Sequence, residues 1–274
     1  MKITVISLFR DSEPDIHNCL SRLEDLERNT DAEFEYSFYE NDSVDNTREI
    51  LKKWIEGRDG FLTFEDLNAP KFSNTASDQR NYLMTDYRNK SLNAIKPIDS
   101  DFSIVFDSDV IFDENIVNLF FSYMEDDIAM VTPNVLQNIN CKMFDSQKKS
   151  YYDSYALIDK DMNNGMTWAS NPFYRKEDRE NWDNGKPVEV FSAFGGFIML
   201  RSKILNKVQW YTEGHCEHWS LCSQVGKFGK ILVIPRIITE VYHSRAIIDS
   251  ISDENINRVV EFQKNKLNDK YFSK

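Results

Sequence analysis

The chain has 274 residues, of which 41% are hydrophobic, and its formal net charge is −12. The acidity excludes the clustered basic surface that nucleic-acid binding needs, and the length allows one large domain or two small ones. The longest apolar stretches fall short of the roughly 20 residues that cross a bilayer, and the N-terminus lacks a signal-peptide pattern. We therefore expect a soluble, cytoplasmic protein with no transmembrane segment, whose four cysteines, which have no CxxC spacing, are free thiols.

The first half of the chain alternates between strand and helix patterns. Strands are expected at residues 2–9, 33–40, 60–65 and 101–107, and helices at residues 14–28, 44–56 and 77–95, the second of them capped by Ser43. This alternation predicts an α/β fold with a mostly parallel, doubly wound central sheet flanked by helices. Ligands in such sheets bind beyond the carboxyl ends of the strands.

The second half of the chain is less regular. Residues 138–184 have weak periodicity but many aromatic side chains, which favours a binding lid over disorder. Further strands are expected at residues 188–192, 196–201, 230–235 and 237–243, and helices at residues 217–228 and 250–267.

The predicted strands of the first half end in polar residues. These ends read "LFRD" at residues 8–11, "YENDS" at 39–43 and "FDSD" at 106–109. Asp107 and Asp109 lie where the fourth strand ends and the chain can turn, so one or both carboxylates can reach a cation. Such oxygens suit Mg²⁺ or Mn²⁺, with phosphate oxygens and water completing the coordination. The pattern therefore indicates a metal that holds a diphosphate, and a simple capped turn is its alternative.

Other phosphate-handling motifs fit less well. The chain has neither a GxGxxG after its first strand nor a GxxxxGK[ST], which argues against a Rossmann dinucleotide site and a P-loop. "SIVFDSDVI" also resembles the strand-plus-DxD pattern of haloacid-dehalogenase phosphatases, whose first Asp is a nucleophile. That pattern opens its fold and carries Thr or Val four residues later, whereas here three βα units come first and the position is Ile111.

Two further segments present groups suited to a diphosphate or a sugar. Arg80 and Arg88 lie near one face of the helix at residues 77–95, and guanidinium groups there could neutralise a diphosphate. Gly195 and Gly196 would permit close approach of the backbone to a ligand. Exposed helix arginines and a strand bulge are the structural alternatives.

Two late segments carry possible catalytic and metal-binding side chains. Glu217 opens a helix, where it could deprotonate a hydroxyl or simply stabilise the helix N-terminus. His215 and His218 flank it, but with the nearby cysteines they fit no usual zinc spacing. His243 ends a late strand and could bind a metal as neutral imidazole.

The order of these segments, from residue 3 to residue 243, resembles that of GT-A nucleotide-sugar glycosyltransferases. "YENDSVDNT", the Arg88-Asn89 pair and "CEHW" are most similar to the capsule-associated and Golgi mannosyltransferase branch, although Glu40-Asn41 stands where that family has two acids. The resemblance implies that Asp107, Asp109 and His243 bind the metal and that Asp109 and Glu217 are catalytic. The implied donor-binding residues are Phe9, Arg10, Glu40, Asn41, Asp42, Arg80, Arg88, Asp107, Ser108, Gly195 and Gly196.

We therefore expect one GT-A domain at residues 1–245, with a nucleotide-binding half at 1–135 and an acceptor half at 136–245, and a helical extension at 246–274. The expected reaction moves a sugar from a GDP- or UDP-linked donor to a hydroxyl of a glycan or another acceptor, with Mn²⁺ or Mg²⁺. Glu217 would be the base if configuration inverts and would orient substrate if it is retained. A nucleotidyltransferase acting on sugar phosphates and a non-catalytic carbohydrate-binding protein are the alternatives. The first needs a glycine-rich basic loop after the first strand, and the second needs aromatics without a metal site.

Overall fold

Strands and helices alternate through the first half of the chain, as their hydrophobic pattern predicted. The computed structural model describes residues 1–72, 77–139, 148–212, 215–241 and 261. The elements of the first half are β1 (Lys2–Phe9), α1 (Glu13–Asn29), β2 (Glu33–Asn41), α2 (Thr47–Ile55), β3 (Gly60–Glu65), α3 (Asp78–Ile95) and β4 (Phe102–Asp107).

The second half contains more regular structure than its sequence pattern indicated. Its elements are β5 (Val110–Ile111), α4 (Ile116–Phe121), β6 (Ile128–Ile139), β7 (Lys148–Tyr151), α5 (Lys176–Asp183), β8 (Val188–Val190), β9 (Phe197–Arg201), α6 (Ser202–Leu205), α7 (Glu217–Val225) and β10 (Lys230–Val241). The two predicted late strands are one strand, β10, whose pairing with β6 shifts register between Ile234 and Ile238. The helix expected at residues 250–267 and the extension at 246–274 fall almost entirely outside the described residues.

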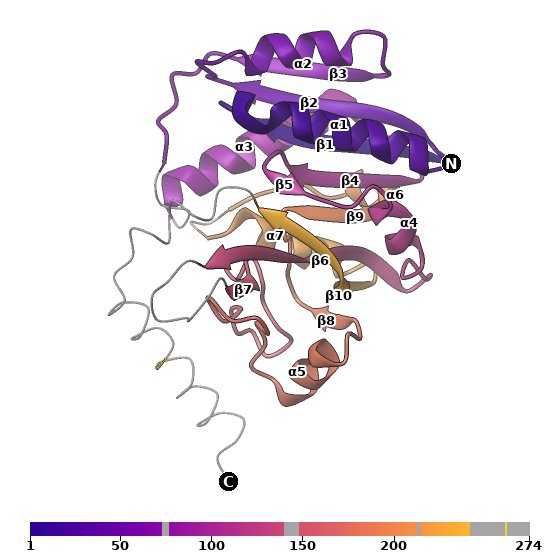
Figure 1. The fold of residues 1–274 in the computed structure, drawn as a ribbon, viewed down its shortest axis with the longest axis vertical. Coiled ribbons are helices and arrows are strands. Elements are labelled where there is room, and N and C mark those ends of the chain that lie inside the picture. Colours follow the sequence, from indigo (N-terminus) through magenta and orange to yellow (C-terminus); the bar gives the residue numbers. More distant parts are fainter. Residues whose placement is uncertain (73–76, 140–147, 213–214, 242–260, 262–274) are drawn as a thin grey trace.

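One sheet joins both halves of the chain. Within the described residues the strand order is β3-β2-β1-β4-β9-β6-β10-β5. The pairs β1–β2, β2–β3, β1–β4 and β6–β10 are parallel, while β9 runs antiparallel to both β4 and β6. The predicted α/β fold with a mostly parallel sheet is therefore confirmed (Figure 1).

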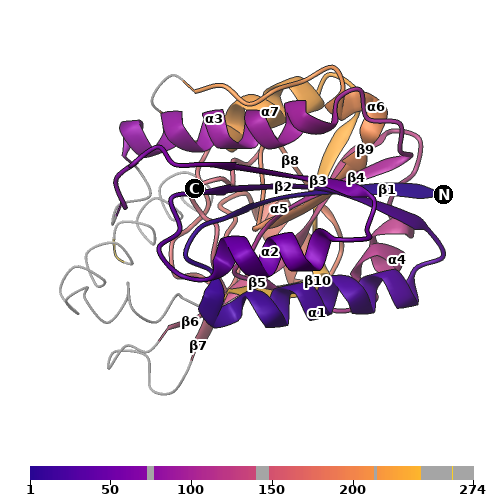
Figure 2. The ribbon, with the colours of Figure 1, turned by 90° about the horizontal axis from the view of Figure 1, so that it is seen from above.

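Helices cover both faces of this sheet. Figure 2 shows α3, α6 and α7 over one face and α1, α2 and α4 over the other. Neighbouring residues of β4 point into opposite cores, since Ile104 and Phe106 join one apolar cluster and Val105 joins the other. Strands buried on both faces favour continuous apolar sequences, which leaves the polar strand ends as the unusual positions.

The predicted cap of the second helix is wrong. α2 begins at Thr47 with Asn46 as its N-cap residue, three residues after Ser43. The Ser43 hydroxyl accepts a hydrogen bond of 2.9 Å from the backbone N–H of Asp11 instead. Ser43 therefore ties the carboxyl end of β2 to that of β1, which a local helix-capping rule does not anticipate.

Candidate active site

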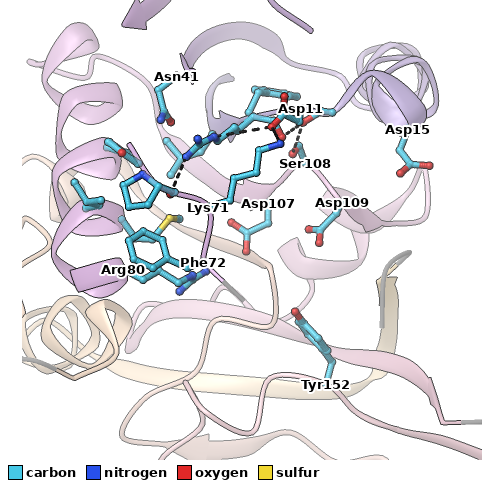
Figure 3. Close-up of a pocket in the computed structure, with 18 residues that line it drawn as sticks. Asp11, Asp15, Asn41, Lys71, Phe72, Arg80, Asp107, Ser108, Asp109 and Tyr152 are labelled. Atoms are coloured by element: carbon cyan, nitrogen blue, oxygen red, sulfur yellow. Dashed lines mark hydrogen bonds and ion pairs between the residues drawn. The ribbon is translucent and has the colours of Figure 1, made fainter. Parts of the chain in front are cut away.

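A cavity of about 730 Å³ lies at the carboxyl ends of β1, β2 and β4. Its lining residues are Leu8, Phe9, Arg10, Asp11, Ser12, Asp15, Asn41, Pro70, Lys71, Phe72, Arg80, Leu83, Met84, Tyr87, Asp107, Ser108, Asp109 and Tyr152 (Figure 3). The predicted donor-binding residues among them are Phe9, Arg10, Asn41, Arg80, Asp107 and Ser108. Other predicted site residues do not belong to this lining: Glu40, Asp42, Arg88, Gly195, Gly196 and Glu217. His243 lies outside the described residues.

The DxD segment forms a turn between two strands. β4 ends at Asp107, and β5 begins at Val110 directly after Asp109. The backbone N–H of Asp107 donates to the Gly196 carbonyl at 2.8 Å, which anchors the start of the turn. Figure 3 shows both carboxylates at the cavity, with the Tyr152 ring across from them. The tight turn thus presents two carboxylates to one space.

Arg88 contacts this turn but does not line the cavity. Its side chain is 3% exposed, with Nη2 2.9 Å from Asp107 Oδ1 and Nε 3.3 Å from Glu217 Oε1. Its guanidinium carbon also lies 4.8 Å from the centre of the Phe194 ring. Because a buried guanidinium needs compensating charge, the two carboxylates fix Arg88 in place. The structure therefore gives Arg88 two protein partners where the sequence suggested a diphosphate.

Glu217 and His218 complete this buried group at the start of α7. Glu217 is 3% exposed, and its Oε1 lies 3.4 Å from Nε2 of His218. The His218 ring stacks on Phe194 with 3.7 Å between the ring centres. Burial, assisted by the positive charge of Arg88, lowers the pKa of His218 well below its usual value. His218 is consequently neutral, and Arg88 is the cation that faces Glu217.

Of the three polar residues at the carboxyl end of β2, Asn41 lines the cavity, while Glu40 and Asp42 contact other parts of the protein. Glu40 is fully buried and pairs with Arg48 at 2.5 Å, so its carboxylate serves the fold. Asp42 accepts hydrogen bonds from the backbone N–H groups of residues 67, 68 and 69 and thereby holds the loop after β3. Asn41 is the member of this segment that lines the cavity.

That loop delivers a basic residue that sequence reasoning missed. Lys71 lines the cavity and forms an ion pair of 2.5 Å with Asp11. Arg10, from the end of β1, donates to the carbonyls of Ala69 and Pro70. Arg80 enters from the first turn of α3. A lone lysine in a loop carries no sequence signal, and only the contacts of the loop place Lys71 beside the other two cations.

Tyr87 and Tyr152 are two other cavity residues that sequence motifs did not identify individually. Tyr87 stacks on Tyr39 with 5.3 Å between ring centres, and its hydroxyl has no hydrogen-bond partner among the described residues. Tyr152 belongs to the aromatic region predicted as a lid, which gave a general signal for its role.

Residues 30–225 match the family model described as Cryptococcal mannosyltransferase 1, and the chain belongs to this family. With its α/β fold, the protein is a GT-A nucleotide-sugar glycosyltransferase of the mannosyltransferase-like kind. No curated protein matches the sequence.

Solved structures show the same fold at low sequence identity. TarS residues 1–349 from S. aureus are 14% identical with a TM-score of 0.52, and the match covers 98% of this chain and 72% of that one. The mannosyltransferase PcManGT from Pyrobaculum calidifontis, solved with GDP-Man and Mn²⁺, is 11% identical with a TM-score of 0.52, covering 97% and 69%. This chain matches 44% of the longer TarS structure, at 14% identity and a TM-score of 0.54.

In the part of the chain that the structure describes, every helix is too short or too polar to cross a membrane.

Proposed function

We propose that this glycosyltransferase moves a sugar from a nucleoside-diphosphate donor to a hydroxyl of a glycan acceptor and requires Mn²⁺ or Mg²⁺. The observation that supports it most directly is the Asp107–Asp109 turn in a cavity that also receives Arg10, Lys71 and Arg80. Carboxylates for a cation and cations for phosphates in one space match the charges of a metal–diphosphate group.

The donor set fits a metal shared with substrate. No group of three or more His, Cys, Asp or Glu side chains that could hold a metal occurs among the described residues. Mg²⁺ is commonly held by one or two carboxylates together with substrate phosphates and water. Asp107 and Asp109 would hold the ion in this way, and His243 is a proposed third ligand outside the described residues. The bound ion would stabilise the negative charge of the departing nucleoside diphosphate.

The cavity residues suggest distinct parts of the donor site. Asn41 and Phe9 lie at the ends of β2 and β1, where we propose that base and ribose bind. Arg80 is proposed to face the diphosphate and Ser108 to donate to it, because both line the cavity with Asp107. Gly195 and Gly196 do not line the cavity, but the Gly196 carbonyl accepts a hydrogen bond from the N–H of Asp107.

We propose that Glu217 positions Arg88 and is not the base. A base must lie within hydrogen-bond reach of the acceptor hydroxyl. Glu217 is buried beside Arg88 and His218 and does not belong to the cavity lining. This arrangement favours retention of configuration over inversion with Glu217 as base.

Aromatic side chains offer a surface for the acceptor. Tyr152, Tyr155 and Trp219 are partly buried and pack against one of the two apolar clusters, to which both halves of the chain contribute. The ring centres of Tyr155 and Trp219 lie 5.9 Å apart, and the indole N–H of Trp219 donates a hydrogen bond to the backbone carbonyl of Tyr155. Sugar rings pack their C–H faces on such rings, so we propose that a glycan acceptor binds here.

A donor panel tests the reaction and its metal dependence together. The panel contains GDP-mannose and UDP-linked sugars, each with Mn²⁺, with Mg²⁺ or with EDTA, and turnover is measured as release of the nucleoside diphosphate. GDP-mannose comes first because the family description names a mannosyltransferase and the PcManGT structure holds GDP-Man with Mn²⁺. We expect turnover of one donor type and its loss in EDTA.

Asp109→Asn should lower this turnover by at least about a hundredfold, because the charge that holds the cation is removed. Asp113→Asn is the matched control, since Asp113 is exposed and its side chain accepts a local hydrogen bond from the Asn115 N–H. Full activity of Asp109→Asn or undiminished turnover in EDTA would contradict the metal role. Pyrophosphate release from a nucleoside triphosphate and a sugar phosphate would favour a nucleotidyltransferase, and glycan binding without nucleotide binding would favour a carbohydrate-binding protein.

A further inference from the structure

Asp153 is a carboxylate near the site to which the proposed reaction assigns no role. It follows Tyr152, whose side chain lines the cavity, in the segment after β7. Burial raises the pKa of Asp153 to about 6, although hydrogen bonds from the N–H groups of Gly195 and Ala156 oppose the rise. Burial thus disfavours the charged form of Asp153, and the partners of its two oxygens show how the group is held.

The two oxygens of Asp153 have different partners. Oδ1 accepts from the N–H of Ala156 at 3.2 Å, a local bond that closes the turn of its own segment. Oδ2 accepts from the N–H of Gly195 at 3.0 Å, in a segment 42 residues further along the chain. The first bond would explain a simple loop cap, but the second joins two separate parts of the site.

Gly195 belongs to a turn that leads directly to Asp107. Gly195 and Gly196 have φ values of +61° and +64°, which favour glycine. The Gly196 carbonyl accepts from the N–H of Asp107 at 2.8 Å, and the neighbouring Phe194 ring contacts Arg88. A displacement of this turn would thus reach both the backbone and the charge partner of Asp107.

We propose that Asp153 is a positioning residue that joins the Tyr152 side of the cavity to the Asp107–Asp109 turn through Gly195 and Gly196. Its effect on the reaction rests on the proposed glycosyltransfer. The carboxylate holds the acceptor-side segment and the metal-binding turn at a set separation, so that the acceptor hydroxyl meets the donor sugar in register. Small errors in such a separation slow a reaction strongly without abolishing binding.

The variant Asp153→Asn should keep the hydrogen bond to Ala156 and remove the hydrogen bond to Gly195. The asparagine oxygen can still cap the turn at Ala156, while its NH₂ group would face the N–H of Gly195, donor against donor. Asp178→Asn is the matched control, because burial likewise raises the pKa of Asp178 to about 6 but this residue lies on α5 and lines a different cavity. Hydrogen exchange of the intact protein is measured on peptides that cover residues 194–197 and 104–109, together with kcat and KM for the donor.

We expect faster exchange of both peptides in Asp153→Asn and unchanged exchange in Asp178→Asn. The kcat of Asp153→Asn should fall by about ten- to a hundredfold. Its donor KM should stay within about threefold of the wild-type value, because the donor groups of the cavity are intact. Unchanged exchange at Gly195, or a rise in KM with unchanged kcat, would overturn the role of Asp153. A wild type that turns over no donor would overturn the proposed function instead, and exchange at Gly195 still distinguishes the two failures.

Discussion

Arg88 shows how one residue can connect separate parts of a site. It comes from α3, yet its guanidinium contacts Asp107 at the end of β4 and Glu217 at the start of α7. Its Nη1 has no hydrogen-bond partner among the described residues, so the network is not fully satisfied. Buried ion pairs of this kind add little net stability, but loss of one member leaves the others charged and unpaired.

Arg88→Met should therefore lower the free energy of unfolding by about 3–5 kcal/mol, as measured by urea denaturation. Adding Glu217→Gln to this variant should recover part of the loss, because one uncompensated charge disappears. Arg28→Met is the control: Arg28 is 64% exposed in a surface pair with Asp25, and such pairs contribute about 0–1 kcal/mol. Equal losses of unfolding free energy in Arg88→Met and Arg28→Met would contradict the expected contribution of Arg88 to stability.

At the scale of elements, the connections that follow the strands position many of the residues of the site. Asp42 holds the loop after β3, and this loop brings Lys71 to the cavity. The Gly195–Gly196 turn before β9 lies against Val110, the first residue of β5. A Cβ atom at Gly196 would come within 2.4 Å of a Val110 methyl group. The absence of a side chain at Gly196 therefore allows Val110, and with it the segment after Asp109, to pack against this turn.

Gly196→Ala should destabilise the protein more than Gly57→Ala. Both glycines have positive φ, and alanine there costs about 1–2 kcal/mol, but a Cβ at Gly57 would meet no atom within 4 Å. The clash at Gly196 should add about 1–3 kcal/mol and should weaken Mn²⁺-dependent turnover, because β5 must shift. The comparison uses thermal denaturation and the donor assay on both variants. Equal stability of the two would mean that the turn at Gly196 has room to relax.

At the scale of the whole molecule, the first and second halves of the chain share one sheet. The expected boundary at residue 135 falls inside β6, and β9 from the second half pairs with β4 from the first. Strands of the two halves therefore complete one another's hydrogen bonding. We propose that the halves at residues 1–135 and 136–245 are regions of ligand binding within one folding unit.

Unfolding should accordingly be a single cooperative transition. Hydrogen exchange of β2 and β10 peptides at low urea should report the same opening free energy, because neither half can keep its sheet edges paired alone. Coincident far-UV circular dichroism and tryptophan fluorescence curves would agree with this. A lower opening free energy for one half would show that the halves unfold separately.

The sequence by itself determined the first four strands, their helices, the fold class and the acidic turn after β4, because buried parallel strands read as apolar runs and polar strand ends interrupt them. It did not indicate β6 or the single course of β10, since both lie among segments whose alternation is weak or interrupted by Pro133 and Pro235. Only the tertiary structure decided which polar residues face the cavity. Glu40, Asn41 and Asp42 are consecutive, yet they serve the core, the cavity and a loop because their partners come from distant segments. The local sequence does not indicate which distant segments supply those partners. For the same reason, the positions of Lys71 and Asp153 at the site could not be predicted from the sequence.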